Sequence, residues 1–173
     1  MAVANGRAYV QVGDFESGTS ALLAYDIGAF GSPPRWQQRS GCNSASPTAH
    51  LSIVFVGAIA CRPSGDDGGV RAFDAATGRQ LWYSHELGIG NGTEDASNVA
   101  ATSGAIYFSR YENAVYGGDS ALMSLDARTG AVRWQVPGGF GAPAVAGGRV
   151  YATGVRFADD RYAVAADQFR LGG

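Results

Sequence analysis

The chain has 173 residues and a formal net charge of −2, from 13 basic and 15 acidic side chains. So small a charge argues against a nucleic-acid or membrane-surface partner. The basic residues are all arginine and are scattered along the sequence, which predicts no basic stripe. No apolar run approaches the roughly 18 residues that span a bilayer, and no charged-then-apolar leader pattern is present. The 26 glycines and many strand formers predict an all-β fold with tight turns.

The first half of the repeat is a hairpin, in which two apolar strands are joined by a tight turn. A strand–turn–strand pattern occurs four times, and its aromatic residue recurs at intervals of 46, 52 and 44 residues. Asn5-Gly6 and Gly147-Gly148 supply the positive φ that a two-residue turn needs. Leu51-Ser52 is a poor turn pair, and there we follow the alignment. The four aromatic positions are Tyr9, Phe55, Tyr107 and Tyr151.

The second half of the repeat is a strand that ends in Asp and is followed, eight or ten residues later, by Trp. The Trp residues are 46 and 52 residues apart, which is the period of a four-stranded propeller blade. In the second and third copies an Ala-Xaa-Thr-Gly turn follows Asp. The members are Asp26 with Trp36, Asp74 with Gly78 and Trp82, and Asp126 with Gly130 and Trp134.

The strands, named A to D in each unit, divide the chain into four segments. We expect B, C and D before Cys42, four strands up to Leu87, four more up to Pro137, and A, B and C up to Asp167. This predicts about fourteen strands and three and a half blades, in segments of about 1–41, 42–88, 96–138 and 141–168. Such a unit cannot close a ring, so we expect either the remaining blades of a longer chain or a second copy to complete it.

The paired signature Ala/Ser-Xaa-Asp-Xaa-Xaa-Thr-Gly-Xaa-Xaa-Xaa-Trp, with a following Pro-Thr or Pro-Ala strand, resembles the pyrroloquinoline-quinone (PQQ) type propeller repeat from Val3 to about Asp167. That family includes quinoprotein alcohol dehydrogenases, an outer-membrane assembly lipoprotein and extracellular sensor domains of bacterial kinases. The resemblance implies an all-β propeller of four-stranded antiparallel blades. The same repeat serves enzymes and scaffolds, so it does not choose between them.

The repeated residues are interpreted as structural. The Asp that ends the third strand can accept backbone N–H bonds of the next turn, and the turn glycine can adopt the left-handed conformation. The resemblance implies that each indole docks onto the neighbouring blade. These roles fall to Asp26, Trp36, Asp74, Gly78, Trp82, Asp126, Gly130 and Trp134, and the predicted core comprises Val54, Val56, Phe73, Ile106, Phe108, Leu125 and Val150.

A quinone site is the enzymatic alternative. Dehydrogenases of this family bind PQQ beneath a disulfide of adjacent cysteines, beside calcium held by acidic and amide groups. This sequence has no Cys-Cys pair, and acidic pairs such as Asp66-Asp67 are typical of solvated turns. No Gly-Xaa-Ser-Xaa-Gly elbow, phosphate loop or zinc spacing is present. We therefore predict no catalytic residue, metal or cofactor, with PQQ and calcium as the alternative.

Cys42 and Cys61 are the two cysteines of the chain. If Leu51-Ser52 is a two-residue turn, the numbers of opposed residues add up to 103, as those of the cysteines do. The pair would then face each other at about 5.5 Å between Cα atoms, within disulfide range. We predict an intrablade disulfide and an extracytoplasmic location, which is secreted, periplasmic or the external part of a membrane protein. Two buried free thiols are the alternative.

Binding is expected on the face with the D-to-A and B-to-C loops, because these vary in length while the opposite turns are short and stereotyped. The sequence predicts a non-catalytic binding or scaffold module for a protein or small ligand, with no nucleic acid and no membrane insertion. One alternative is a fragment of a PQQ- and calcium-dependent quinoprotein dehydrogenase; another is that the loops are solvated spacers. Candidate residues are Asp66, Asp67, His85, Glu86, Asn91, Glu94, Asp95, Arg110, Tyr111 and Asn113.

Overall fold

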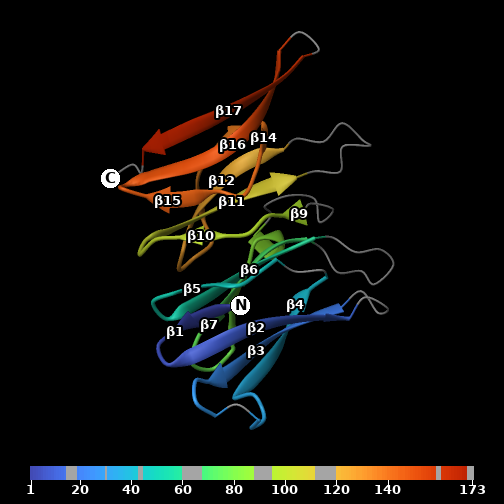
Figure 1. Cartoon of the computed structure of the whole chain (residues 1–173), viewed down its shortest axis with the longest axis vertical. Coiled ribbons are helices and arrows are strands. Elements are labelled where there is room, and N and C mark those ends of the chain that lie inside the picture. Colours follow the sequence, from blue (N-terminus) through green and yellow to red (C-terminus); the bar gives the residue numbers. More distant parts are fainter. Residues whose placement is uncertain are drawn as a thin grey trace.

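The computed structural model describes residues 1–14, 19–29, 31–42, 45–59, 68–87, 95–111, 120–158 and 161–170. Four antiparallel β-sheets follow one another along the chain and are stacked along the long axis of the molecule (Figure 1). The predicted all-β class with four-stranded antiparallel blades is confirmed. Among the described residues the helical element is the 3-10 turn η1 (His85–Leu87), and no helix there is long and apolar enough to cross a membrane.

The strands of each sheet are consecutive in the sequence. The first sheet contains β1 (Ala2–Ala4), β2 (Arg7–Asp14), β3 (Thr19–Asp26) and β4 (Trp36–Gly41). The second contains β5 (Thr48–His50), β6 (Ile53–Ala58), β7 (Gly69–Asp74) and β8 (Gln80–Tyr83). The third contains β9 (Asp95–Ala96), β10 (Ala100–Ala101), β11 (Ala105–Tyr111), β12 (Ala121–Asp126) and β13 (Val132–Pro137). The fourth contains β14 (Gly139–Phe140), β15 (Ala144–Ala146), β16 (Arg149–Ala158) and β17 (Arg161–Arg170).

The first sheet has one strand more than we predicted. β1 pairs with β2 from Ala2↔Tyr9 to Ala4↔Arg7 and is strand A of that blade, so the expectation of three strands before Cys42 was wrong. The strand–turn–strand pattern at Asn5-Gly6 already includes these residues, but the strand count began with strand B and left them out. In the fourth sheet β15, β16 and β17 are the expected strands A, B and C.

The A-to-B hairpins have the predicted two-residue turns. Asn5 and Leu51 both adopt positive φ, at 51° and 52°, and Gly147 occupies the same conformation at 54°. The pair His50↔Ile53 closes the second hairpin, so the alignment placed the turn correctly although its chemistry is unfavourable. A left-handed Leu is unusual, because its Cβ crowds the backbone there.

Strand A of the last three sheets is broken into two pieces. The outer piece is β9 on β11, β14 on β16, and a single bridge from Cys42 to Ile59 in the second sheet. Between the two pieces a backbone N–H donates to strand B in every case. These bonds are Ala45 N to Gly57 O at 2.7 Å, Ser97 N to Ser109 O at 2.9 Å, and Gly141 N to Thr153 O at 2.6 Å.

The core lies between the sheets. β5 contacts β1 and β10, and β10 contacts β15, so the A strands of successive sheets are neighbours, as in propeller blades. One apolar cluster fills each of the three gaps. The seven predicted core residues are each at most 1% exposed, which confirms them: Val54, Val56, Phe73, Ile106, Phe108, Leu125 and Val150.

Candidate functional site

The repeated Asp organises the turn that follows strand C. Oδ1 of Asp74 accepts hydrogen bonds from the backbone N–H of Ala76 at 3.1 Å and of Thr77 at 2.8 Å. The Thr77 hydroxyl donates to the same oxygen at 2.8 Å. Gly78, at φ 75°, closes the turn by donating its N–H to the backbone oxygen of Asp74. Asp126 makes the corresponding three bonds at 3.0 to 3.1 Å in the third sheet.

The first copy holds its Asp in a different way. Arg35 approaches Asp26 at 2.5 Å and Arg7 approaches it at 3.6 Å, in place of a threonine hydroxyl. The bond from Arg35 lowers the pKa of Asp26 below its ordinary value. In the third sheet the bond from Arg133, at 2.9 Å, is the largest cause that lowers the pKa of Asp126 to about 2. All three carboxylates are therefore charged at neutral pH.

The indoles connect one sheet to the next. Nε1 of Trp36 donates to the backbone oxygen of Ala75 at 3.2 Å, and Nε1 of Trp82 donates to that of Ala127 at 3.1 Å. Both acceptors directly follow the repeated Asp of the next sheet. A Cβ at Gly78 would lie 2.6 Å from the Trp36 ring, so the glycine also provides the space for the indole. The turn thus receives the tryptophan of the preceding blade.

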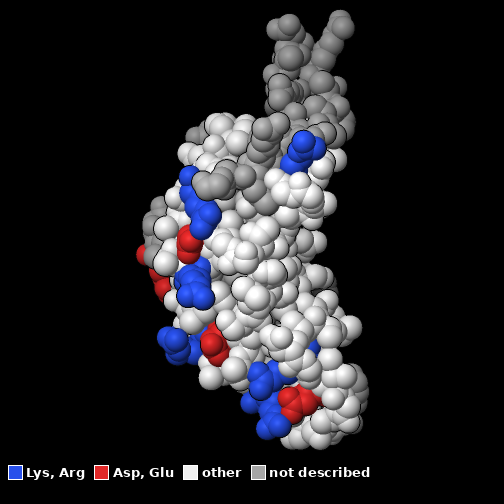
Figure 2. Space-filling model, turned by 90° about the vertical axis from the view of Figure 1, so that its left-hand side faces the viewer, with Lys and Arg blue, Asp and Glu red and all other residues white. Residues whose placement is uncertain are grey.

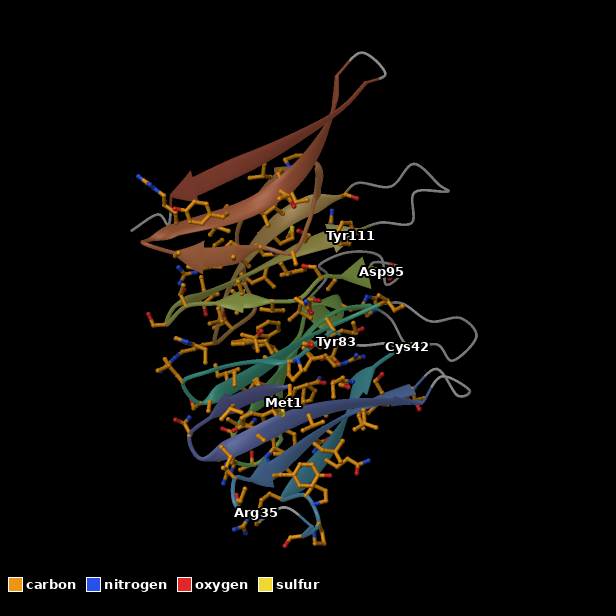
Figure 3. All side chains as sticks on the ribbon, viewed as in Figure 1. Met1, Arg35, Cys42, Tyr83, Asp95 and Tyr111 are labelled. Atoms are coloured by element: carbon orange, nitrogen blue, oxygen red, sulfur yellow. The ribbon has the colours of Figure 1, made fainter. Side chains whose placement is uncertain are left out.

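Loop-side residues of the first two sheets form a polar contact. The Arg71 guanidinium lies 3.9 Å above the centre of the Tyr83 ring and donates to the backbone oxygen of Ser40 at 3.0 Å. A Cβ at Gly41 would lie 2.5 Å from Arg71 Nη1, so the glycine admits the guanidinium. The candidate His85 lies beside this group, with its ring centroid 5.8 Å from that of Tyr83. Tyr83 is on the loop side of the molecule in Figure 3.

Three further candidates come together at the loop-side end of β11. Asp95 pairs with Tyr111, and Arg110 pairs with Ala96, in the β9–β11 register. The Tyr111 hydroxyl donates to the backbone oxygen of Phe140, which belongs to the next sheet. Asp95 and Tyr111 lie near each other on the loop side (Figure 3). The structure therefore forms two groups, one around Tyr83 and one around Tyr111. Glu86, the remaining described candidate, is exposed in η1.

The other five candidates lie outside the described residues, and they are Asp66, Asp67, Asn91, Glu94 and Asn113. Three residues that the sequence reasoning did not select hold the loop side together, namely Ser40, Arg71 and Tyr83. Arg71 occupies the strand position of Leu23 and Met123 in the neighbouring sheets. A charged residue at an apolar position of the repeat was the signal available for finding it.

The register predicted for the cysteines is wrong. Cys42 is fully buried, and its bridge partner across the strands is Ile59, two residues before Cys61 in the sequence. The two-residue hairpin register extends from His50 to Thr48 only, because the break in strand A shifts the pairing. Cys61 lies outside the described residues. The disulfide between the two therefore stays a prediction.

The described residues contain no acidic cluster for the calcium that accompanies a quinone in the dehydrogenases. Within the described ranges no group of three or more His, Cys, Asp or Glu side chains is close enough to hold a metal, whereas calcium requires six to eight oxygen ligands. The sequence also lacks adjacent cysteines. We therefore derive no chemical step through PQQ from these residues.

The comparisons with known proteins agree with this geometry. The family model described as outer membrane protein assembly factor BamB matches residues 1–135 and 66–169. The chain belongs to this family of PQQ-type propeller repeats. The repeat resemblance drawn from Asp, Thr-Gly and Trp is thereby confirmed. No curated protein matches the chain.

Two solved structures share the fold. The quinohemoprotein alcohol dehydrogenase from Comamonas testosteroni superposes with a TM-score of 0.66 at 17% identity, over 88% of this chain and 28% of that one. A europium-containing methanol dehydrogenase superposes with a TM-score of 0.57 at 15% identity, over 79% of this chain and 24% of that one. The chain thus spans about a quarter of the length of each. At these identities the likeness shows the fold alone.

Proposed function

We propose that the chain is a non-catalytic part of a PQQ-type propeller that binds a protein or small ligand with its loop side. The observation that supports this most is the Arg71–Tyr83 group beside His85. Arg71 is only partly buried, and the structure gives it one hydrogen bond and a ring contact but no carboxylate partner among the described residues. A fixed guanidinium next to aromatic rings suits a carboxylate or a polar protein surface.

A photo-crosslinking amino acid at Glu86 tests this proposal in the intact protein. Glu86 is exposed and lies in the same 3-10 turn as His85. We expect one dominant adduct, with a mass different from that of any adduct formed at Gly28, which is on the opposite side of the first sheet. A protein that gives no adduct at Glu86, or the same adducts at both positions, would contradict the proposal.

A second candidate function is part of a PQQ- and calcium-dependent dehydrogenase, and it is favoured by the names of the two structural neighbours. Absorbance titration of the intact protein with PQQ and calcium distinguishes the two functions. The scaffold proposal predicts a spectrum equal to the sum of the separate components and no dye reduction when an alcohol is added. Saturable binding of PQQ with alcohol-dependent dye reduction would support the dehydrogenase instead.

We also propose that the chain works outside the cytoplasm with a Cys42–Cys61 disulfide. The support is the family description, which names an outer membrane assembly factor, and the burial of Cys42 at the bridge to Ile59. Peptide mass mapping without reductant should recover both cysteines in one linked peptide. Recovery of two unlinked thiols from protein made under oxidising conditions would overturn this.

A further blade is the partner that we propose for the outer flank of the first sheet. Val10 and Leu23 occupy positions on this flank whose equivalents in the third sheet, Phe108 and Met123, are buried against the second sheet. Val12 on the same flank is 51% exposed. A hollow of about 360 Å³ beside Val12 and Arg39 lies on the same flank. Such a surface requires another blade, from the same polypeptide or a second copy. Light scattering should therefore show self-association of the chain at micromolar concentration; a stable monomer would contradict this.

A further inference from the structure

The turns of all four sheets form one side of the molecule, here called the turn face. It consists of the A-to-B turns at residues 5–6, 51–52, 103–104 and 147–148 and the C-to-D turns at 27–35, 75–79 and 127–131. In each of the first three sheets a backbone bond ties the two kinds of turn together. These bonds are Ile27 N to Gly6 O at 2.9 Å, Ala75 N to Ser52 O at 2.8 Å, and Ala127 N to Gly104 O at 3.2 Å.

Arginines gather on this face. Among the described residues six arginine side chains lie in or next to these turns, against three acidic side chains (Figure 2). The sequence suggested scattered arginines without a basic surface, and the fold corrects this, because every blade returns its turns to the same side. The arginines are Arg7, Arg35, Arg79, Arg128, Arg133 and Arg149, and the acidic residues are Asp26, Asp74 and Asp126.

The carboxylates are used within the face, whereas three of the guanidiniums form no ion pair there, although the charge of Arg79 helps to lower the pKa of Asp74. Asp26 and Asp126 pair with neighbouring arginines, and Oδ1 of Asp74 accepts bonds from its own turn. Arg79, Arg128 and Arg149 are exposed, and the structure assigns them no ion pair among the described residues. The face therefore has cationic groups that remain available to a partner.

The fourth sheet strengthens this charge. At one register position the first sheet pairs Arg7 with Asp26, and the second and third sheets also place their Asp there. In the fourth sheet the same position pairs Arg149 with Arg170. The repeat has thus lost its acidic residue at the end of the face that already has a free arginine.

Large apolar side chains are exposed between the arginines. Ile27, Leu51 and Val132 are 49%, 61% and 50% exposed, and all three lie in or beside the turns of this face. Leu51 is also left-handed, at a position where the first hairpin has Asn5. An exposed Leu in a strained turn conformation gains nothing for the fold itself, since Asn tolerates that conformation better.

We propose that the turn face is a second docking surface, and that its partner is an acidic protein segment with apolar side chains between its carboxylates. Guanidiniums bind carboxylates in a planar, bidentate manner, and arginine interspersed with apolar groups is typical of protein interfaces. The three Asp carboxylates and the exposed apolar groups disfavour a polyphosphate surface such as nucleic acid or an anionic lipid headgroup layer. This proposal does not depend on the loop-side function.

The probe is a fluorescein-labelled synthetic peptide in which Glu alternates with Leu, measured by anisotropy with the full chain. Two control peptides separate the two requirements. A peptide in which Lys alternates with Leu tests the need for negative charge, and a peptide in which Glu alternates with Ser tests the need for apolar side chains. We expect saturable binding of the Glu-Leu peptide, weaker binding of the Glu-Ser peptide, and none of the Lys-Leu peptide. The affinity should fall as salt is added, because exposed ion pairs are screened.

Matched variants locate the site. Arg128→Gln removes a free guanidinium of the turn face, and Gln135→Glu makes the same change in net charge at an exposed position within β13. We expect Arg128→Gln to weaken binding of the Glu-Leu peptide by about threefold to tenfold and Gln135→Glu to leave it unchanged. Leu51→Asn places the residue of the first hairpin, Asn5, in the second. It should weaken binding of the same peptide without lowering the melting temperature of the chain.

Each outcome decides the proposal. Binding that is weakened in Arg128→Gln and kept in Gln135→Glu supports it. Equal losses in both variants would show a general charge effect and overturn it, as would failure of the Glu-Leu peptide to bind. If phosphatidylglycerol vesicles or single-stranded DNA bind in an Arg128-dependent way while the peptide does not, the face recognises phosphate and the proposal is wrong. If Leu51→Asn raises stability but leaves peptide binding intact, the apolar part of the proposal is wrong.

Discussion

Trp36 and Trp82 each donate an indole hydrogen bond to a backbone oxygen of the next sheet, but the residues around the two bonds differ. Between the first and second sheets the Ala75 oxygen accepts from Trp36, and also from the Tyr9 hydroxyl at 3.2 Å and Arg7 at 3.0 Å. Between the second and third sheets the Ala127 oxygen accepts from Trp82. Phe55 and Ile53 occupy the positions of Tyr9 and Arg7 there.

The comparison separates what the repeat requires from what it tolerates. The indole bond and the ring contact recur, with centroids 5.9 Å apart for Tyr9–Trp36 and 6.0 Å for Phe55–Trp82. The neighbouring donors vary, because an apolar ring fills the same space without a hydroxyl. Burial raises the pKa of Tyr9, which keeps its hydroxyl protonated as a donor. We infer that packing of the rings carries more of the stability than the additional hydrogen bonds.

The largest expected effect is the loss of Trp82. The indole is 5% exposed and lies in the apolar cluster between the second and third sheets. Trp82→Ala should lower the free energy of unfolding by about 3–5 kcal/mol, through lost burial and the cavity that remains. Chemical denaturation of the intact chain measures it, with the exposed Glu86→Ala as a control that should stay within about 0.5 kcal/mol. Similar losses in both variants would show that Trp82 does not anchor the sheets.

A methyl group at Gly78 tests how closely the turn and the indole fit. Gly78→Ala forces a left-handed alanine, which costs about 1–2 kcal/mol. It also places Cβ 2.6 Å from the Trp36 ring, and such overpacking typically costs about 1–3 kcal/mol. Gly148→Ala is the matched control, because its φ is 70° and no atom lies within 4 Å of the added Cβ. Equal destabilisation of the two variants would mean that the indole moves aside without cost.

The repeat could be predicted from the sequence because each of its residues has one physical reason to be there. Asp74 accepts turn amides, Gly78 adopts positive φ, and Trp82 docks. These reasons act within one blade or between two neighbours, so spacing alone conveys them. The break in strand A has no such residue signal and was missed. The strand β1 belongs to the predicted Asn5-Gly6 hairpin, and only the strand count omitted it.

The candidate site was less accessible to sequence reasoning. Arg71 and Tyr83 lie opposite each other in the β7–β8 register, and Ser40 comes from the preceding sheet. The contact depends on how the two blades are placed relative to each other, and the lengths and residues of the loops do not specify this. The basic turn face has the same origin. Arginines that are far apart in the chain become neighbours only when four blades are stacked.

Acid titration tests whether an arginine or a turn hydroxyl stabilises the repeated Asp. The pKa of Asp126 in the folded chain is about 2, below the ordinary value of 3.8, chiefly because of Arg133. Its stabilisation is therefore complete above about pH 4 and is lost as the pH falls from 4 to 2. Asp126→Asn should lower stability at neutral pH and flatten the dependence in that window. An unchanged slope between pH 4 and pH 2 would contradict this.

Asp74 provides the contrast, because the Thr77 hydroxyl is the largest cause that lowers its pKa. Added salt should reduce the effect of Asp126→Asn more than that of Asp74→Asn, since an exposed ion pair is screened and a hydrogen bond within the turn is not. Equal salt sensitivity would show that the arginine contributes no more at Asp126 than the threonine does at Asp74.

The smallest expected effect is that of the Tyr9 hydroxyl. Tyr9→Phe makes the first contact between sheets resemble the second, and Ala75 O keeps the bonds from Trp36 and Arg7. A hydrogen bond typically contributes about 0.5–1.5 kcal/mol, and we expect the lower end because the acceptor stays satisfied. The reciprocal Phe55→Tyr, which offers Ala127 O a second donor, should change stability by a similarly small amount. Urea denaturation of both variants measures this. A loss above about 2 kcal/mol for Tyr9→Phe would mean that hydrogen bonds, and not ring packing, hold the first two sheets together.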